Sequence, residues 1–143
     1  MEIVIAQHAW IQTESAGSEN GFKQLPFPEP RTVALSSSTK TNNDPLESLT
    51  DGKLARSYGP VFANGVESGS YKMDLGRVET VEAISSWSYR MGRRGAQRLM
   101  LYGSALNRDP GWNPDALTPI GSIDTRGDKG ELFHAASLRA ADG

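Results

Sequence analysis

The stretch that decides the fold is residues 71–104, YKMDLGRVETVEAISSWSYRMGRRGAQRLMLYGS. Apolar and polar side chains alternate in residues 71–75 and again in residues 81–89. A period of two predicts β-strands with one buried face. Residues 97–103 repeat the pattern after a polar turn, with Leu99 and Leu101 on one face. The stretch therefore predicts three strands joined by short turns.

Shorter signals on either side of this stretch agree with it. Apolar runs predict strands at residues 33–35 and 118–124, and residues 2–12 hold another run that fits a strand. Residues 45–49 fit a single helical turn, and residues 131–138 fit either a strand or a short helix. The sequence contains no internal repeat and no long amphipathic helix. Short strands separated by turns predict an all-β fold, either a sandwich or a barrel.

Composition limits the class of protein. The 143 residues fit one domain, and an apolar share of 37% is enough for one core. The net charge is −2, with 15 basic and 17 acidic residues interspersed. This balance argues against a nucleic-acid partner held by electrostatics and against a polybasic membrane patch. The absence of cysteine excludes disulfides, thiolate catalysis and cysteine zinc sites.

The N-terminal residues bear on localisation. Residues 1–7, MEIVIAQ, lack the basic region and long apolar run of a signal peptide. No stretch is long and apolar enough for a transmembrane helix, so membrane insertion is not expected. Two alternatives follow, an intracellular protein or a piece of a longer exported chain. We favour the second because of the family resemblance described next.

The order of the sequence motifs is more specific than any single motif. The chain carries, in order, LTDG (49–52), YKMDLGRVETVEAI (71–84), SWSYRMGRRGAQRLMLYGS (86–104), GW (111–112) and PIGSIDT (119–125). This set resembles the discoidin family, also called coagulation-factor C-type domains, and is most similar to bacterial members. The resemblance covers roughly residues 31–138. It implies an antiparallel β-sandwich of the jelly-roll, galactose-binding-like type.

The resemblance also sets the expected domain boundaries. Residues 31–143 would form the discoidin-like domain, and residues 1–30 a leader segment or an extra strand with a loop. Family members usually end with two further strands, which the sequence lacks after residue 138. A sandwich without its closing strands exposes sheet edges. We therefore expect marginal stability, aggregation, or completion by another chain or by residues 2–12.

Asp51 has two readings. Asp51-Gly52 is a turn pair in which glycine accepts a positive φ. Family members often hold a structural Ca²⁺ in the corresponding loop, and the resemblance implies Asp51 as one ligand. Oxygen ligands suit Ca²⁺, but the late acidic ligand of the family has no match in this sequence. The turn and the calcium site both stay open.

Candidate ligand-binding residues lie in the loops that the resemblance implies, around residues 56–62, 89–95 and 107–114. Sugar recognition uses exposed aromatic rings together with planar hydrogen-bonding groups. The residues that supply these groups are Arg56, Tyr58, Tyr89, Arg90, Arg93, Arg94, Asn107 and Trp112. Alternatively, Trp87 is a core residue, and Trp112 is a core residue or one that anchors its loop by packing. The arginines either contact an anionic glycan or pair with nearby acids in a solvated turn.

No catalytic motif is present, and an enzyme is not expected. The sequence lacks a Gly-x-Ser-x-Gly elbow, a His-Glu-x-x-His pair and a phosphate-cradling glycine loop. We expect a carbohydrate-binding or adhesion module of a larger extracellular or cell-surface protein, with a glycan or cell-surface polysaccharide as partner. The alternative is a structural or protein–protein interaction spacer. Open aromatic or arginine side chains on one rim would favour the sugar-binding module.

Overall fold

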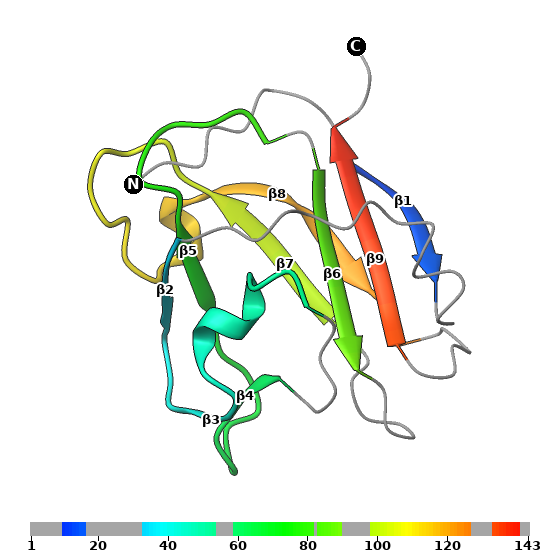
Figure 1. Cartoon of the computed structure of the whole chain (residues 1–143). Coiled ribbons are helices and arrows are strands. Elements are labelled where there is room, and N and C mark those ends of the chain that lie inside the picture. Colours follow the sequence, from blue (N-terminus) through cyan, green and yellow to red (C-terminus); the bar gives the residue numbers. More distant parts are fainter. Residues whose placement is uncertain are drawn as a thin grey trace.

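The computed structural model describes residues 10–16, 33–53, 59–81, 83–89, 98–126 and 133–140 (Figure 1). Nearly all regular structure within these residues is β-strand, with two short 3₁₀ helices, η1 and η2. The elements are β1 (Trp10–Ala16), β2 (Ala34–Ser37), β3 (Thr41–Asn43), η1 (Leu46–Leu49), β4 (Pro60–Phe62), β5 (Tyr71–Asp74), β6 (Ala83–Tyr89), β7 (Arg98–Gly103), η2 (Pro114–Ala116), β8 (Thr118–Asp124) and β9 (Phe133–Ala140). The all-β class predicted from sequence is confirmed.

Several predicted elements lie where the sequence placed them, whereas β1 (Trp10–Ala16) overlaps only the end of the predicted run at residues 2–12 and ends four residues beyond it. Strand β8 matches the predicted strand at residues 118–124, and η1 matches the helical turn at residues 45–49. The ambiguous C-terminal segment is a strand, β9. Strands β3 and β4 were not predicted. Each has only three residues, too few to show a period of two.

Strand β9 is the centre of a three-stranded antiparallel sheet in the order β1-β9-β6. Its partner β6 pairs along its whole length, from Ala83 opposite Arg139 to Tyr89 opposite Phe133. On the other edge of β9 lies β1, with an irregularity between Gln12 and Glu14. An N-terminal strand therefore covers the second edge of β9. Residues 1–9 and 17–30, the rest of the expected leader, lie outside the described residues.

The buried core joins this sheet to the β7–β8 hairpin. Ile123 of β8 packs with Ala136 and Leu138 of β9, and all three are buried. Leu99 and Leu101 pack against this cluster from the face of β7 that their spacing predicted. The contacts pack the hairpin against β9. Burial of each Ile or Leu side chain contributes about 1.5–3 kcal/mol, so this cluster is a main source of stability.

Two small antiparallel pairs, β2–β5 and β3–β4, form the remaining sheets among the described residues. An aromatic pair connects them. The rings of Phe62 (β4) and Tyr71 (β5) are stacked, with centroids 4.9 Å apart and planes inclined at 19°. The Tyr71 hydroxyl also donates a hydrogen bond to the Pro60 carbonyl at 3.0 Å. Stacking and the hydrogen bond together fix β5 against β4.

The Asp-Gly turns of the sequence form as predicted. Gly52 and Gly76 both have a positive φ, of 70° and 76°. The Asp74 carboxylate accepts the backbone N–H of Gly76 at 2.8 Å. The carboxylate closes its own turn, because an aspartate reaches the N–H two residues on with little loss of entropy.

Candidate functional site

The candidate Trp112 lies in the connection between β7 and η2. Trp112 is 40% exposed. The ammonium of Lys72, on strand β5, lies 4.0 Å from the centroid of the Trp112 ring. At this distance the cation is attracted to the π-face of the indole. The core alternative for Trp112 is therefore wrong: the ring is held at the surface by a strand distant in sequence.

Asp109 completes this cluster. Its Oδ1 accepts a hydrogen bond from Lys72 Nζ at 2.5 Å and another from the backbone N–H of Gly111 at 2.8 Å. The hydrogen bond from Lys72, and then that from Gly111, hold the pKa of the Asp109 carboxyl below its ordinary value. The carboxylate is thus ionised at neutral pH. We call Lys72, Asp109 and Trp112 the tryptophan site.

Two local turns fix the backbone around Trp112. The Asp109–Gly111 turn precedes it, and Gly111 has a φ of 77°, which glycine adopts without strain. Asn113 follows it and caps η2, since its side-chain oxygen accepts the N–H of Asp115 at 3.1 Å. The tryptophan therefore stands between two hydrogen-bonded turns. This arrangement limits the freedom of the ring before any ligand binds.

The ion pair of the tryptophan site is unequally exposed. The Lys72 side chain is only 13% exposed, whereas the Asp109 side chain is 68% exposed. The alternation in residues 71–75 had placed Lys72 on the polar face of its strand. The side chain is nevertheless enclosed, because Trp112 and Asp109 lie over that face. The surface that a ligand meets is consequently an indole ring beside a carboxylate.

Two of the candidate ligand-binding residues belong to one connection. Asn107, which is exposed, and Trp112 lie in the same connection after β7. Tyr89 is the last residue of β6, and its side chain is not described. The candidates outside the described residues are Arg56, Tyr58, Arg90, Arg93 and Arg94. These five remain predictions.

The connection with Trp112 does not share a strand end with Tyr89. Tyr89 leads into β7 at Arg98, whereas the connection with Trp112 leaves β7 at Gly103. Six residues of strand separate these points, a span of about 17–20 Å. The arrowheads of β6 and β7 accordingly point to opposite ends (Figure 1). Because residues 54–58 and 90–97 lie outside the described residues, the expectation that all three loops gather at one end stays a prediction.

Asp51 is engaged in its own turn. Its Oδ1 accepts the backbone N–H of Lys53 at 2.8 Å. In the part of the chain that the structure describes, no three His, Cys, Asp or Glu side chains are grouped to hold a metal ion. A calcium ion at Asp51 would therefore depend on backbone carbonyls for most of its ligands. That site stays a prediction.

Two residues of the tryptophan site were missed in the sequence. Lys72 and Asp109 are 37 positions apart, and no spacing rule connects them. Asp109 carried a weak local signal, since Asp-Pro-Gly is typical of a turn. Lys72 carried none, because a lysine on the polar face of a strand is ordinary. Only the packing of the connection over β5 brings the two together.

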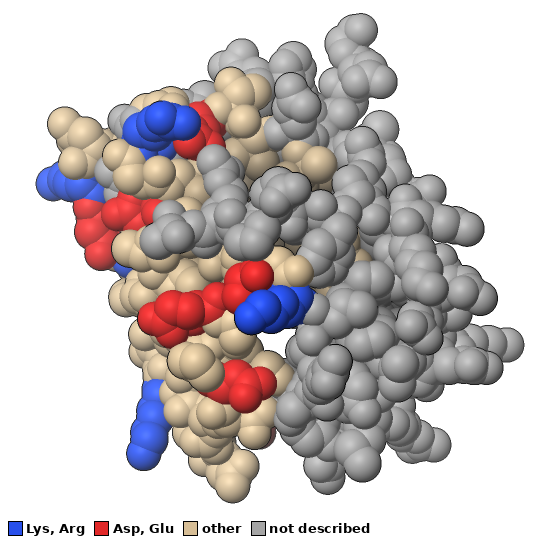
Figure 2. Space-filling view, in the orientation of Figure 1, with Lys and Arg blue, Asp and Glu red and all other residues tan. Residues whose placement is uncertain are grey.

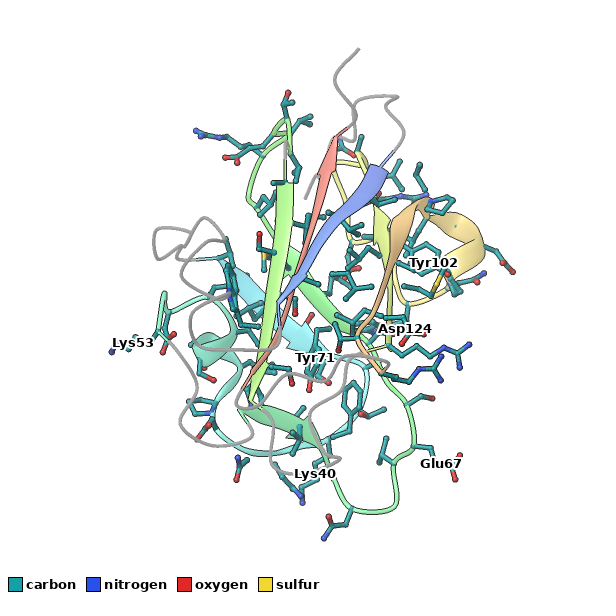
Figure 3. All side chains as sticks on the ribbon, turned by 90° about the vertical axis from the view of Figure 1, so that its right-hand side faces the viewer. Lys40, Lys53, Glu67, Tyr71, Tyr102 and Asp124 are labelled. Carbon is teal, nitrogen blue, oxygen red and sulfur yellow. The ribbon has the colours of Figure 1, made fainter. Side chains whose placement is uncertain are left out.

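Charges elsewhere on the described surface are mixed in sign. Figure 2 shows basic and acidic side chains adjoining one another on one face. Arg126 pairs with Asp124 at 2.5 Å, and Arg77 pairs with Glu79 at 2.9 Å. Asp124 is the last residue of β8 (Figure 3). The hydrogen bond from Arg126 lowers the pKa of its carboxyl to about 2. Because the opposite charges of each pair lie side by side, their electrostatic fields largely cancel, and little positive potential is left to attract a polyanion.

Comparison with known proteins adds no relative. No protein-family model, curated protein or solved structure matches this chain. Among the described residues, no helix has the length and apolar character needed to cross a bilayer. A function is therefore inferred from the chemistry of the tryptophan site and from the order of motifs in the sequence.

Proposed function

We propose that this chain is a non-catalytic carbohydrate-binding or adhesion module with a discoidin-like β-sandwich fold of the jelly-roll type. In this proposal it belongs to a larger extracellular or cell-surface protein. The observation that carries the proposal is Trp112, which is 40% exposed while Lys72 lies over its ring. An aromatic ring that is both exposed and fixed suits stacking against the C–H face of a sugar.

The energetics of stacking support this use of Trp112. An indole ring offers a large apolar surface, and its exposure to water is unfavourable until a ligand covers it. The cation–π contact with Lys72 and the turns on both sides reduce the entropy lost on binding. Asp109 beside the ring adds an ionised acceptor for sugar hydroxyls. Apolar stacking next to a hydrogen-bond acceptor matches the two-sided chemistry of a pyranose.

The sandwich fold has support of its own. The β7–β8 hairpin packs against β9 through Ile123 and Leu138, as a sandwich would require. Strands β5, β6 and β7 follow the sequence motifs shared with the discoidin family. Together these features favour two packed antiparallel layers with functional side chains in the connections.

A glycan-array screen of the whole chain tests the proposal. We expect saturable binding to one class of glycan, and Trp112→Ala should weaken it about tenfold or more. Met100→Ala is the matched control, because Met100 is an apolar side chain with 61% exposure on strand β7. Absence of binding by a folded chain would sink the proposal and leave the structural or protein-interaction spacer.

Thermal unfolding tests the calcium prediction. It is measured with added Ca²⁺ and with a chelator, on the wild type and on Asp51→Ala. If Ca²⁺ binds at Asp51, the ion should raise the melting temperature of the wild type but not of the variant. An equal response in both proteins would exclude Asp51 as the ligand.

A further inference from the structure

We infer that the tryptophan site selects neutral, hydroxyl-rich sugars over sulfated or carboxylated ones. This inference rests on the proposed carbohydrate binding and deepens it by naming the ligand class. It departs from the sequence, in which clustered arginines suggested an anionic glycan as an alternative. What decides the selectivity is which charge of the site faces solvent.

The positive charge of the site, the Lys72 ammonium, is already paired with groups of the protein. Lys72 Nζ contacts the Asp109 carboxylate at 2.5 Å and lies 4.0 Å from the centre of the Trp112 ring. Only 13% of the Lys72 side chain is exposed. A sulfate or carboxylate on a ligand would have to displace Asp109 to reach this ammonium. The cation therefore serves to hold the site together and is not presented to a ligand.

The negative charge of the site faces outward. The Asp109 side chain is 68% exposed, and both of its described hydrogen bonds enter the same oxygen, Oδ1. An ionised carboxylate has about four acceptor positions over its two oxygens. Acceptor capacity is therefore left for hydroxyl donors beside the indole ring. A neutral sugar supplies such donors, whereas a sulfate ester supplies none and adds a like charge.

Screening limits the size of this selectivity. Two like charges about 4 Å apart in water repel by an energy equivalent to roughly a fivefold change in affinity at low salt. We therefore expect the unsulfated form of a sugar to bind about fivefold more tightly than the sulfated form. Because the charges are exposed, added salt should narrow this ratio.

Calorimetric titration of the whole chain with paired probes tests the inference. The probes are glucan, galactan and mannan oligosaccharides, each with and without sulfate. The wild type should prefer the unsulfated probe about fivefold, and Asp109→Asn should reduce the preference to about twofold or less. This substitution keeps a side-chain oxygen for the Gly111 N–H but removes the charge. Asp124→Asn, another exposed carboxylate paired with a neighbouring cation, should leave the preference unchanged.

The outcomes separate this inference from the proposed function. Equal or tighter binding of the sulfated probe to the wild type would overturn the inference and leave carbohydrate binding intact. An unchanged preference in Asp109→Asn would also overturn it, because the discrimination would then arise elsewhere. Should that variant fail to fold, the wild-type preference must narrow with added salt, and a salt-independent preference counts against the inference. If no probe binds, the proposed function and the inference both fail.

Discussion

At the scale of single residues, Lys72 links two residues of the connection after β7 to strand β5. It projects from β5 and joins the ring of Trp112 to the carboxylate of Asp109. Its side chain is largely enclosed, so its methylene stem also covers apolar surface. Lys72 therefore attaches this connection to strand β5. The position of Trp112 depends on it.

Replacement of Lys72 by methionine should loosen the tryptophan without disrupting the strand. Methionine keeps most of the stem but removes the charge. We expect the free energy of unfolding to fall by about 0.5–1 kcal/mol, the usual size of an exposed cation–π contact. Urea denaturation measures the loss, and tryptophan fluorescence should move to longer wavelength. Lys40→Met, at an exposed position, is the control, and equal effects in both variants would contradict the assigned role.

The carboxylates predict a pH dependence of stability. Hydrogen bonds from cations lower the pKa of Asp109 and bring that of Asp124 from 3.8 to about 2 in the folded state. A lowered folded pKa stabilises the protein above the unfolded pKa, and this contribution is lost as the pH falls through the folded value. Stability should therefore decline between about pH 4 and pH 2. Urea midpoints across this range should decline less in Asp124→Asn, and an identical pH profile would refute the assignment.

At the scale of elements, Gly69 in the connection between β4 and β5 lies very close to the side chains of Phe62 and Thr39. A Cβ on Gly69 would lie 2.7 Å from Cε1 and Cζ of Phe62 and 3.0 Å from Oγ1 of Thr39. Phe62 is stacked on Tyr71, so the phenyl ring has little freedom to retreat. Glycine is thus needed here for a close approach.

Gly69→Ala should disturb the aromatic pair that connects the two small sheets. We expect a loss of about 1–3 kcal/mol in the free energy of unfolding, as for overpacking elsewhere. The near-ultraviolet circular dichroism of the tyrosine should weaken with it. Ser68→Ala, at the preceding exposed position, should change neither quantity by much. A stable Gly69→Ala protein with an unaltered spectrum would show that the ring moves away at little cost.

The length of a strand decides whether it could be predicted from the sequence. Strands β6 and β7 contain seven and six residues, enough alternation to reveal a period of two. Strands β3 and β4 are too short for that, and their pairing depends on tertiary contact. Trp112 was identified as a candidate from its residue type and its loop. Its partners Lys72 and Asp109 could not be, because their contact arises only when the connection folds over β5.

At the scale of the whole molecule, the β7–β8 hairpin and β9 meet in a small core. Ile123 of β8 and Leu138 of β9 are almost completely buried within it. The core fixes strand β7, which ends at Gly103, where the connection with Trp112 begins. The geometry of the tryptophan site therefore depends on this distant packing.

Ile123→Ala should accordingly destabilise the whole described fold. Large-to-small substitution of a buried isoleucine costs about 2–5 kcal/mol, because the cavity adds to the lost burial. Denaturant unfolding measures this cost, and Val78→Ala at an exposed site should change stability far less. Equal effects of the two substitutions would show that the stacking of β8 on β9 contributes little.

The measurement that tests the central claim most directly is a nuclear magnetic resonance titration of the whole chain with neutral oligosaccharides. Such a titration reports both whether a glycan binds and where. If sugars bind at the tryptophan site, we expect saturable chemical-shift changes of the Trp112 indole N–H and of the Gly111 amide, which donates a hydrogen bond to Asp109. Shifts confined to residues away from the tryptophan site, or no shifts at all, would contradict it.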